Sequence, residues 1–454
     1  MSKYKYTLRD YHAIKEAEIK LDGITVLSGI NGCGKSTLSR WLYYLVNGSA
    51  RFEEFLFYLY IDSIITKINR LSLAVGEIER NYFWEDINIQ ENTFYNELDD
   101  AEKEFNRIIY SSDKLEEIIG FVSVVFTKIT IDARKYFLDS FSKEKVSEVK
   151  KKRVFTLLRI NLEDKSEKTA LLEFEEENTA WIQDISKNLV DNIRIRSSEM
   201  FFKLISKHYY IGMKDPINIQ LSEDNVNILE DGYTLKLFNL THAIYVDTPM
   251  SITSNDTNNI FWNDLRRRII ADTPDKANNQ KLLIRIKRIL GGETILNKDE
   301  LSANKTLRFI TADNKINILL KDVATGYKSF SYIQRLLENG ELTSETLLMI
   351  DEPEAHLHPQ WIVEFARILV MLHKEIGVKI MIASHNPDMI FAIQAIAKAL
   401  GVIENTNFYL AEPYEGNPHQ YVYRCLGQDI EDIFKSFNVA FDKINTYAGR
   451  SIGL

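Results

Sequence analysis

The sequence has few cysteines and prolines and no long apolar run. Its 454 residues include only eight prolines and two cysteines, Cys33 and Cys425, which lie far apart. Such a pair is no disulfide framework and fits a reducing compartment. The most apolar stretch, 118–126, is much shorter than the roughly 20 residues of a membrane helix, and the N-terminus lacks the apolar segment of a secretory signal. We therefore expect a cytoplasmic protein without membrane contact.

The sequence also lacks an excess of basic residues. Lysine and arginine number 56 against 65 aspartates and glutamates, for a net charge of −9. This balance disfavours attraction of the whole surface to nucleic acid. Local basic runs occur at 149–155, 265–270 and 282–290 on predicted helices. Such runs either bind phosphate backbones or form solvated helix faces, so contact with DNA or RNA stays open.

The remaining composition is that of a globular protein, with 45% hydrophobic and 27% charged residues. Between about 51 and 205, glycine and proline nearly vanish and apolar residues recur at helical spacing, which predicts helices around an acidic loop at 163–178. Strand patterns precede this segment, and strands alternating with helices follow it. We predict an α/β fold with a mostly parallel sheet, an antiparallel β lobe and a helical insertion. The expected divisions are 1–48, 49–205 and 206–454.

A phosphate-binding loop follows a short buried strand at 24–29. Residues 29–36, Gly-Ile-Asn-Gly-Cys-Gly-Lys-Ser, fit the pattern G-x-x-x-x-G-K-[ST] and precede a predicted helix. Glycines let backbone N–H groups wrap around phosphates, and the N-terminus of the helix favours the same anion. Lys35 can bridge the β- and γ-phosphates, and Ser36 can hold Mg²⁺. The expected nucleotide-binding residues of this loop are Gly29, Asn31, Gly32, Cys33, Gly34, Lys35, Ser36 and Thr37.

Two further strands end in residues that suit ATP chemistry. The apolar run 347–350 leads into Asp351 and Glu352. A carboxylate at a strand tip can bind Mg²⁺, so we expect Asp351 to share the metal with Ser36. Glu352 would then orient or deprotonate the attacking water. A second buried strand ends at His385, which could contact the γ-phosphate. The alternatives are solvated acids and an isolated histidine; the predicted catalytic residues are Lys35, Glu352 and His385.

Together these motifs resemble those of ABC-type ATPases, and more narrowly the non-transporter branch with SMC, RecF and OLD-like AAA proteins. The sequence DEPEAHLHP at 351–359, followed by SHNP at 384–387, is similar to that branch. The resemblance covers about the first 48 residues and most of the chain after Tyr209, but not the helical insertion. It implies an ABC-type head in which two copies dimerise and sandwich ATP between them.

In such a dimer, a signature motif of one copy caps the nucleotide of the other. The matching segment here is VATGYKSF at 323–330, and it implies that Thr325, Gly326 and Lys328 contact ATP in trans. It departs from the transporter pattern because Tyr327 replaces the second glycine. The alternative is a plain helix N-cap at Thr325.

The resemblance implies an ATPase that uses ATP and Mg²⁺ and forms a homodimer or higher homo-oligomer. The segment after His385 has no DxD, and the chain has no HNH pattern, so no effector domain is recognisable. The chain most resembles stand-alone ATPase subunits of bacterial anti-phage systems of the Septu and PARIS type, which implies a separate nuclease partner. Alternatives are an SMC/RecF-like ATPase acting on DNA in repair and an ATP-locked scaffold with little turnover.

Three features stay open at this level. The segment after the strand at 242–247 has the shape of a Q-loop but no glutamine, and Gln220 lies earlier in the chain. His356 and His358 could suggest a metal site, although the flanking motif explains them better. Cys33 is either a small residue that fits the loop or a thiol whose oxidation would block ATP binding.

Overall fold

The computed structural model divides into two compact units. A head unit comprises residues 1–50 and 201–454, and a helical unit comprises 51–200. The predicted insertion, 49–205, has boundaries within a few residues of these. No helix in the described part of the chain combines the length and apolarity that a membrane crossing requires. The structure describes residues 3–79, 93–108, 115–142, 146–162, 165–211, 216–247, 259–271, 279–298, 305–436 and 446.

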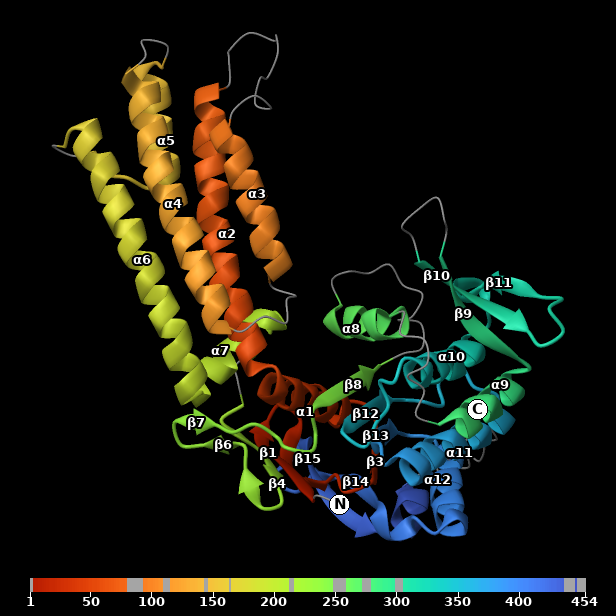
Figure 1. The fold of residues 1–454 in the computed structure, drawn as a ribbon. Helices are drawn as coiled ribbons and strands as arrows, with labels where there is room; N and C mark the ends of the chain where they lie inside the picture. The colour runs from red at the N-terminus through yellow and green to blue at the C-terminus, as the bar shows by residue number, and fades with distance from the viewer. Residues whose placement is uncertain are drawn as a thin grey trace, which may run out of the picture. The chain divides into compact units, whose positions relative to one another are not determined.

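The head unit is built on a ten-stranded mixed sheet with the order β5-β4-β1-β2-β15-β14-β3-β13-β12-β8 (Figure 1). The adjacent strands β14, β3, β13, β12 and β8 are all parallel, whereas β1 pairs antiparallel with β2 and β4. This arrangement confirms the predicted α/β fold with a mostly parallel sheet and an antiparallel lobe. The strands are β1 (Tyr4–Tyr11), β2 (Ile14–Lys20), β3 (Ile24–Ser28), β4 (Asn218–Glu223), β5 (Val226–Asn227), β8 (His242–Val246), β12 (Thr346–Asp351), β13 (Lys379–Ser384), β14 (Thr406–Tyr414) and β15 (Asn417–Gly427).

Helices cover both faces of the parallel region. Strands β3, β12 and β13 are buried at every position, without alternation, as expected for strands that are covered on both faces. One face contributes Val26, Ile350 and Ile382 to a core that also contains residues of several helices. The other face contacts helix α1 (Lys35–Ala50). The helices in this core include α8 (Ile260–Ile269), α9 (Gln280–Leu290), α10 (Thr325–Glu338), α11 (Pro359–Ile376) and α12 (Pro387–Leu400).

The remaining head elements differ from the sequence prediction in three places. The expected strand from Tyr209 begins as a turn after helix α7 (Ser198–His208), and residues 212–215 lie outside the described part. The expected helical stretch 261–290 is two helices, α8 (Ile260–Ile269) and α9. Strand β9 was not predicted, and it pairs antiparallel with β10. The smaller elements are β6 (Leu229–Glu230), β7 (Tyr233–Thr234), β9 (Gly292–Lys298), β10 (Lys305–Thr311), β11 (Asn317–Leu319), η3 (Leu320–Asp322) and η4 (Ile403–Asn405).

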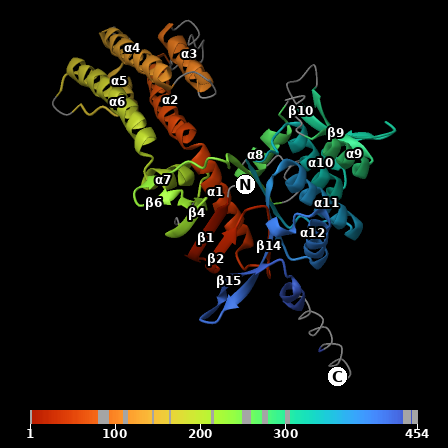
Figure 2. The same ribbon diagram turned by 60° about the horizontal axis from the view of Figure 1, so that its bottom comes forward.

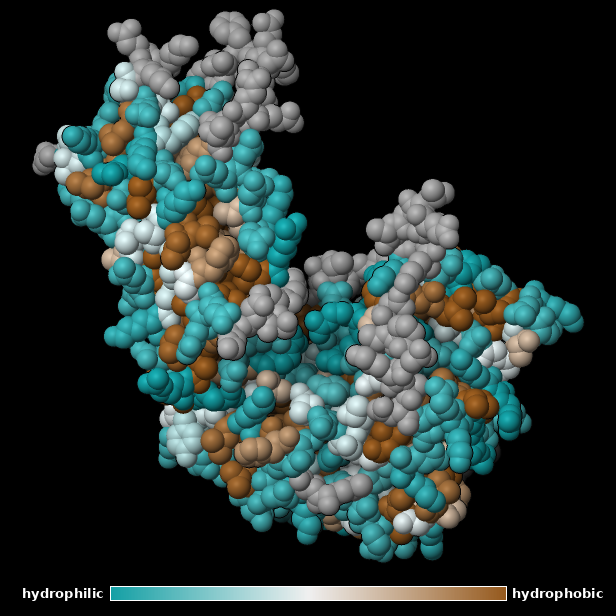
Figure 3. All heavy atoms as spheres, viewed as in Figure 1, coloured by the Kyte–Doolittle hydropathy of each residue, from teal (hydrophilic) through white to brown (hydrophobic). Residues whose placement is uncertain are grey.

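The helical unit is a set of packed helices, in which α4 contacts α6 and α2 contacts α5 (Figure 2). The predicted acidic loop is wrong, because α6 begins at Glu167. The Ser166 side chain accepts a hydrogen bond from the Thr169 N–H and caps this helix. Apolar residues also remain on the unit's surface (Figure 3), and Val124 of α4 is 71% exposed. The helices are α2 (Phe52–Glu79), α3 (Thr93–Ile108), α4 (Leu115–Ser142), α5 (Glu148–Leu158), α6 (Glu167–Ile195) and the first residues of α7.

Candidate nucleotide-binding site

Three neighbouring strands of the head unit deliver the three motifs to one edge of the sheet. β13 lies between β3 and β12, with Ser384 opposite Ser28 and Ala383 opposite Asp351. Because these strands are parallel, their carboxyl ends lie side by side, where open α/β sheets bind ligands. The phosphate loop, Asp351 and His385 are therefore brought together by strand order.

The phosphate loop has the backbone that its glycines permit. Gly34 has φ 101°, and a Cβ there would lie 2.7 Å from Cγ1 of Ile14, so no larger residue fits without displacing β2. Helix α1 begins at the next residue, Lys35. The Lys35 ammonium donates hydrogen bonds to the carbonyl oxygens of Gly29 (2.9 Å) and Ile30 (3.0 Å). The loop thus curls around a cation at the start of a helix, the arrangement expected for binding phosphate. Asn31, Gly32 and Ser36 are exposed in this loop, and Thr37 is half-buried.

Cys33 is enclosed within the loop. The residue is 0% exposed, its Sγ lies 3.6 Å from the Tyr423 hydroxyl, and that hydroxyl donates to the Cys33 carbonyl (3.2 Å). A Cβ at Gly29 would lie only 2.9 Å from the same sulfur. A small buried residue is what this space accepts, which favours a packing role for Cys33 over a reactive thiol.

Asp351 is a buried carboxylate held by two other elements. Its Oδ1 accepts from the Ser39 hydroxyl (3.0 Å) of α1, and its Oδ2 accepts from the Tyr245 hydroxyl (2.8 Å) of β8. Burial raises the pKa of Asp351, while hydrogen bonds from Ser36, Tyr245 and Ser39 oppose this rise. The Ser36 hydroxyl and the Asp351 carboxylate are the oxygen donors that Mg²⁺ prefers, so this donor set fits the expected metal.

Glu352 extends from a strained turn immediately after β12. Its φ is 48°, in the left-handed region, and its N–H donates to the Ala383 carbonyl (2.7 Å). Its side chain is 45% exposed, and Oε1 lies 3.3 Å from Nδ1 of His385. Such backbone strain clusters at functional sites. The acid is thus held at the sheet edge, with the imidazole beside it.

Glu354 belongs to the same cluster, and the sequence analysis did not select it. Its side chain is 5% exposed, and its Oε1 accepts from the Ser384 hydroxyl (2.8 Å) and the His385 N–H (3.3 Å). Oε2 is buried and has no partner among the described residues. Burial raises the pKa of this carboxyl. The signal that could have identified it is a third acid within DEPE, so close to a buried strand end.

The candidate signature lies at the start of α10. Thr325 is the first helical residue, and the N-cap is Ala324, which makes no side-chain capping bond. The alternative of a plain N-cap at Thr325 is therefore wrong. Gly326 packs against α11, because a Cβ there would lie 3.2 Å from Cε3 of Trp361. Lys328 is 3% exposed, and its ammonium donates to the Lys321 carbonyl (2.9 Å). Burial lowers its pKa, so this lysine is directed into the protein and not toward a partner's nucleotide.

The histidines at 356 and 358 and the Q-loop were also left open by the sequence. His358 is the N-cap of α11 and accepts from the Gln360 N–H (3.4 Å). The described residues contain no group of three His, Cys, Asp or Glu that could hold a metal ion, so His356 and His358 have no such cluster there. Gln220 lies in β4, five strands from β3 in the sheet order. The Q-loop candidate falls mostly on 248–258, outside the described residues.

Comparison with known proteins gives a family match over most of the chain. The model of the AAA ATPase domain matches residues 4–390. The energy-coupling factor transporter ATP-binding protein EcfA3 of Clostridium perfringens is 39% identical over 72 residues, 16% of this chain and 25% of that protein. The Old nuclease of Escherichia phage P2 is 34% identical over 100 residues, 22% of this chain and 15% of that protein. The chain thus spans a quarter or less of these two relatives.

Solved structures of SMC heads are also similar. The Smc head with an extended coiled coil from Pyrococcus furiosus, bound to the C-terminal domain of ScpA, matches with TM-score 0.32 and 10% identity. The match covers 97% of this chain and all of that one. An SMC head bound to the C-winged helix domain of ScpA matches with TM-score 0.35 and 9% identity over 93% and 97% of the two chains. The assignment rests on the family match over residues 4–390: this chain belongs to the AAA ATPase domain family.

Proposed function

We propose that this chain binds and hydrolyses ATP at the edge formed by β3, β13 and β12. The observation that carries the proposal is the convergence of the Lys35 loop, the buried Asp351 and the Glu352–His385 pair on three neighbouring strands. These groups come from three separate segments of the sequence, at 29–36, 351–352 and 385. A purely structural strand end does not require a phosphate loop, a buried carboxylate and an acid–imidazole pair together.

The residues divide the chemistry between them. Lys35, the loop N–H groups and the start of α1 bind the phosphates. Ser36 and Asp351 would hold Mg²⁺, which supplies neutralisation of phosphate charge when bound. Glu352 orients the attacking water and accepts its proton, and His385 beside it contacts the γ-phosphate. Residues Gly29, Asn31, Gly32, Cys33, Gly34 and Thr37 complete the loop around the phosphates.

We further propose that ATP closes a dimer of two heads. Thr325 and Gly326 would approach the γ-phosphate bound by the other copy, together with the N-terminus of α10. Support comes from Ala324, the N-cap of α10, which is exposed and provides no side-chain cap for the first turn of this helix. Gly326 is fixed in place by Trp361 of α11, and α11 follows directly from the segment that carries Glu352 and Glu354. Closure of the dimer and hydrolysis would thereby act on the same segment.

The proposed role of this ATP-dependent dimer is control of a separate nuclease in bacterial anti-phage defence. Support comes from the resemblance to ATPase subunits of such systems and from the segment shared with the Old nuclease of phage P2. An ATPase that acts directly on DNA would instead be stimulated by DNA in the absence of any other protein. A scaffold that is locked by ATP would bind the nucleotide with almost no turnover.

The test uses the purified full-length chain with Mg²⁺ and ATP. Phosphate release should be lost in Lys35→Ala and unchanged in Lys315→Ala, whose side chain is 81% exposed. Sedimentation should show dimers with ATP and monomers with ADP when hydrolysis is slowed by Glu352→Gln. Equal phosphate release by the wild type and Lys35→Ala would reject the proposed site. The effector is tested by purifying the native complex and measuring whether a co-purifying nuclease requires ATP to cleave.

A further inference from the structure

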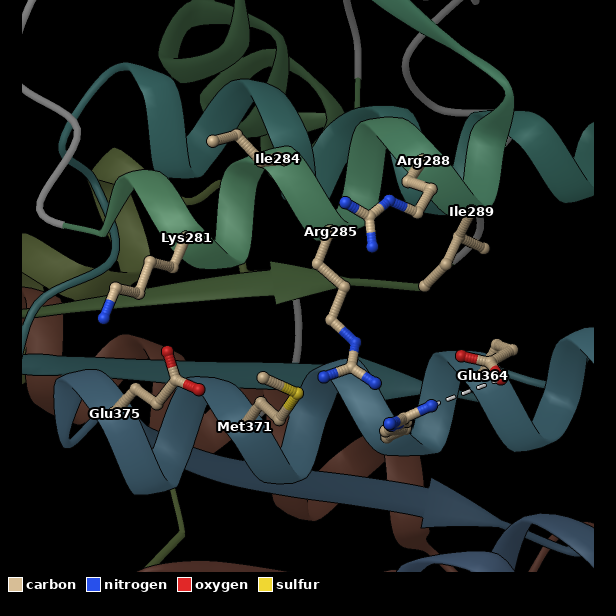
Figure 4. Close-up of a pocket in the computed structure, with 9 residues that line it drawn as sticks. Lys281, Ile284, Arg285, Arg288, Ile289, Glu364, Met371 and Glu375 are labelled. Carbon is tan, nitrogen blue, oxygen red and sulfur yellow. Dashed lines mark ion pairs between the residues drawn. The ribbon is translucent and has the colours of Figure 1, made fainter.

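A groove lies on the head unit between helices α9 and α11 (Figure 4). It has a volume of about 660 Å³. Each wall is one helical stripe, because the lining residues on each helix are spaced three or four apart. The α9 wall consists mainly of Lys281, Ile284, Arg285 and Arg288, with Ile289 beside them. The α11 wall consists of Glu364, Arg367, Met371 and Glu375.

The groove carries an excess of positive charge in an acidic protein. Four cationic side chains line it against two carboxylates, while the whole chain has net charge −9. Among the described residues, Lys281, Arg285 and Arg288 form no ion pair with a carboxylate. Four cations against two carboxylates leave this groove with a local positive potential, which attracts an anionic ligand.

The two carboxylates of the groove are already engaged by nearby groups. Glu364 lies 3.7 Å from Arg367, and the two side chains are 35% and 44% exposed, so this pair is weak. Glu375 accepts from the Asn279 side-chain amide (2.6 Å). Among the described residues, neither acid forms an ion pair with Lys281, Arg285 or Arg288 of α9. Figure 4 shows Arg285 extending from α9 toward α11, between the two walls.

Apolar side chains accompany the cations. Ile284 is 55% exposed, and Ile289 and Met371 are partly buried at the edge of the hydrophobic core. The opposite face of α9 is already used, because Leu282, Leu283, Ile286 and Leu290 are buried in that core. The exposed stripe therefore combines apolar contact area with unpaired positive charge.

We infer that this groove docks an acidic amphipathic segment of a partner protein. Such a segment would place one apolar side chain against Ile284 and Met371 and its carboxylates against Lys281, Arg285 and Arg288. A nucleic-acid backbone matches the charges but gives the apolar side chains nothing to contact. The inference concerns a surface apart from the nucleotide edge and does not depend on ATP turnover.

The groove also adjoins the elements of the proposed dimer site. α9 contacts both α10 and α11, and α11 carries Trp361, which packs on Gly326 one turn before the groove residue Glu364. A segment bound here contacts the same helix that positions the candidate signature. Docking would therefore act on the helix that packs against Gly326 at the start of α10.

The test measures binding of defined peptides to the full-length chain without nucleotide. The probes are labelled 20-residue helical peptides with two leucines at i and i+4 and four flanking glutamates, varied in register. A matched series has the leucines replaced by serine, and a 20-nucleotide single strand and duplex are the nucleic-acid probes. The variants are Arg285→Glu/Arg288→Glu, Ile284→Ser and the control Lys315→Glu/Lys398→Glu on exposed positions elsewhere.

We expect at least one leucine-containing peptide to bind the wild type. The double reversal in the groove should weaken it about tenfold or more, and Ile284→Ser should weaken it about fivefold. The control pair should bind like the wild type, and circular dichroism should confirm that each variant is folded. No binding by any leucine-containing peptide would overturn the inference. Tighter binding of the oligonucleotides, sensitive to Arg285→Glu/Arg288→Glu but not to Ile284→Ser, would overturn it in favour of nucleic acid.

Discussion

Nδ1 of His385 lies 3.3 Å from Oε1 of Glu352, so two residues that directly follow neighbouring strands meet at the candidate site. The pairing of β12 with β13 sets their separation, because Ala383 lies opposite Asp351. The N–H of Glu352 also donates to the Ala383 carbonyl (2.7 Å), which fixes the turn that presents the acid. This relationship is the basis of the first two predictions.

Replacing Glu352 with glutamine should reduce ATP turnover about a hundredfold or more, because the amide cannot accept the proton of the attacking water. ATP binding should persist, since glutamine has nearly the same shape. Single-turnover phosphate release and nucleotide binding measure the two effects. The matched control is Glu404→Gln, at an exposed position of η4, which should hydrolyse normally. Wild-type turnover by Glu352→Gln would instead support the ATP-locked scaffold.

Glu354 is predicted to position the turn after β13. Glu354→Ala removes the acceptor of the Ser384 hydroxyl and the His385 N–H, and an unsatisfied buried donor costs about 1–3 kcal/mol of stability. We expect its kcat to fall much more than its KM rises, because His385 loses its position. Glu354→Gln keeps an accepting oxygen and should retain turnover within a few-fold. An alanine variant with unchanged kcat would show that the acid has no positioning role.

The composite site predicts complementation between two inactive variants. Lys35→Ala disables the phosphate loop. Thr325→Asp places a negative charge where the partner's γ-phosphate would arrive, at a helix start that tolerates acids. A 1:1 mixture should recover about a quarter of wild-type turnover, because half of randomly formed dimers are heterodimers with one intact site each. Steady-state phosphate release measures this recovery. A mixture as inactive as its components would argue against capping in trans.

The free energy of unfolding should fall in mild acid, partly because the His373 side chain becomes protonated. This residue is 2% exposed, and its Nδ1 lies 3.0 Å from the Val378 carbonyl oxygen. Burial lowers its pKa below the ordinary value near 6.5. The folded state thus binds a proton less readily than the unfolded state, so this contribution to stability is complete above pH 6.5 and is lost as the pH falls toward the folded pKa.

Denaturant unfolding at pH 7.5 and pH 5.5 measures this effect. The loss of unfolding free energy between the two pH values should be smaller in His373→Gln than in the wild type. It should not vanish, because burial also lowers the pKa of His242. The control His419→Gln, at an exposed position, should keep the wild-type pH dependence. An identical loss in His373→Gln and wild type would contradict the prediction.

Local signals in the sequence were enough to predict the elements whose defining residues follow one another along the chain. The loop 29–36 was predictable because glycines, a lysine and a helix start follow one another without interruption. The buried strands ending at Asp351 and Ser384 were predictable because runs of apolar residues indicate parallel strands that are covered on both faces. The acidic segment after Ser166 was misjudged, because its buried Ala170 and Leu171 stabilise a helix despite the surrounding charges.

Tertiary structure decided what the sequence spacing could not. Strand order places β13 between β3 and β12, so residues more than 300 positions apart, such as Ser39 and Asp351, share a hydrogen bond. Burial directs Lys328 away from the expected site and makes Glu354 part of the Ser384–His385 turn. The sequence by itself was enough to predict which residues suit ATP chemistry and that the sheet is mostly parallel, since both follow from local patterns. Which side chains meet, and which are buried, depends on long-range packing, and only the folded chain specifies that.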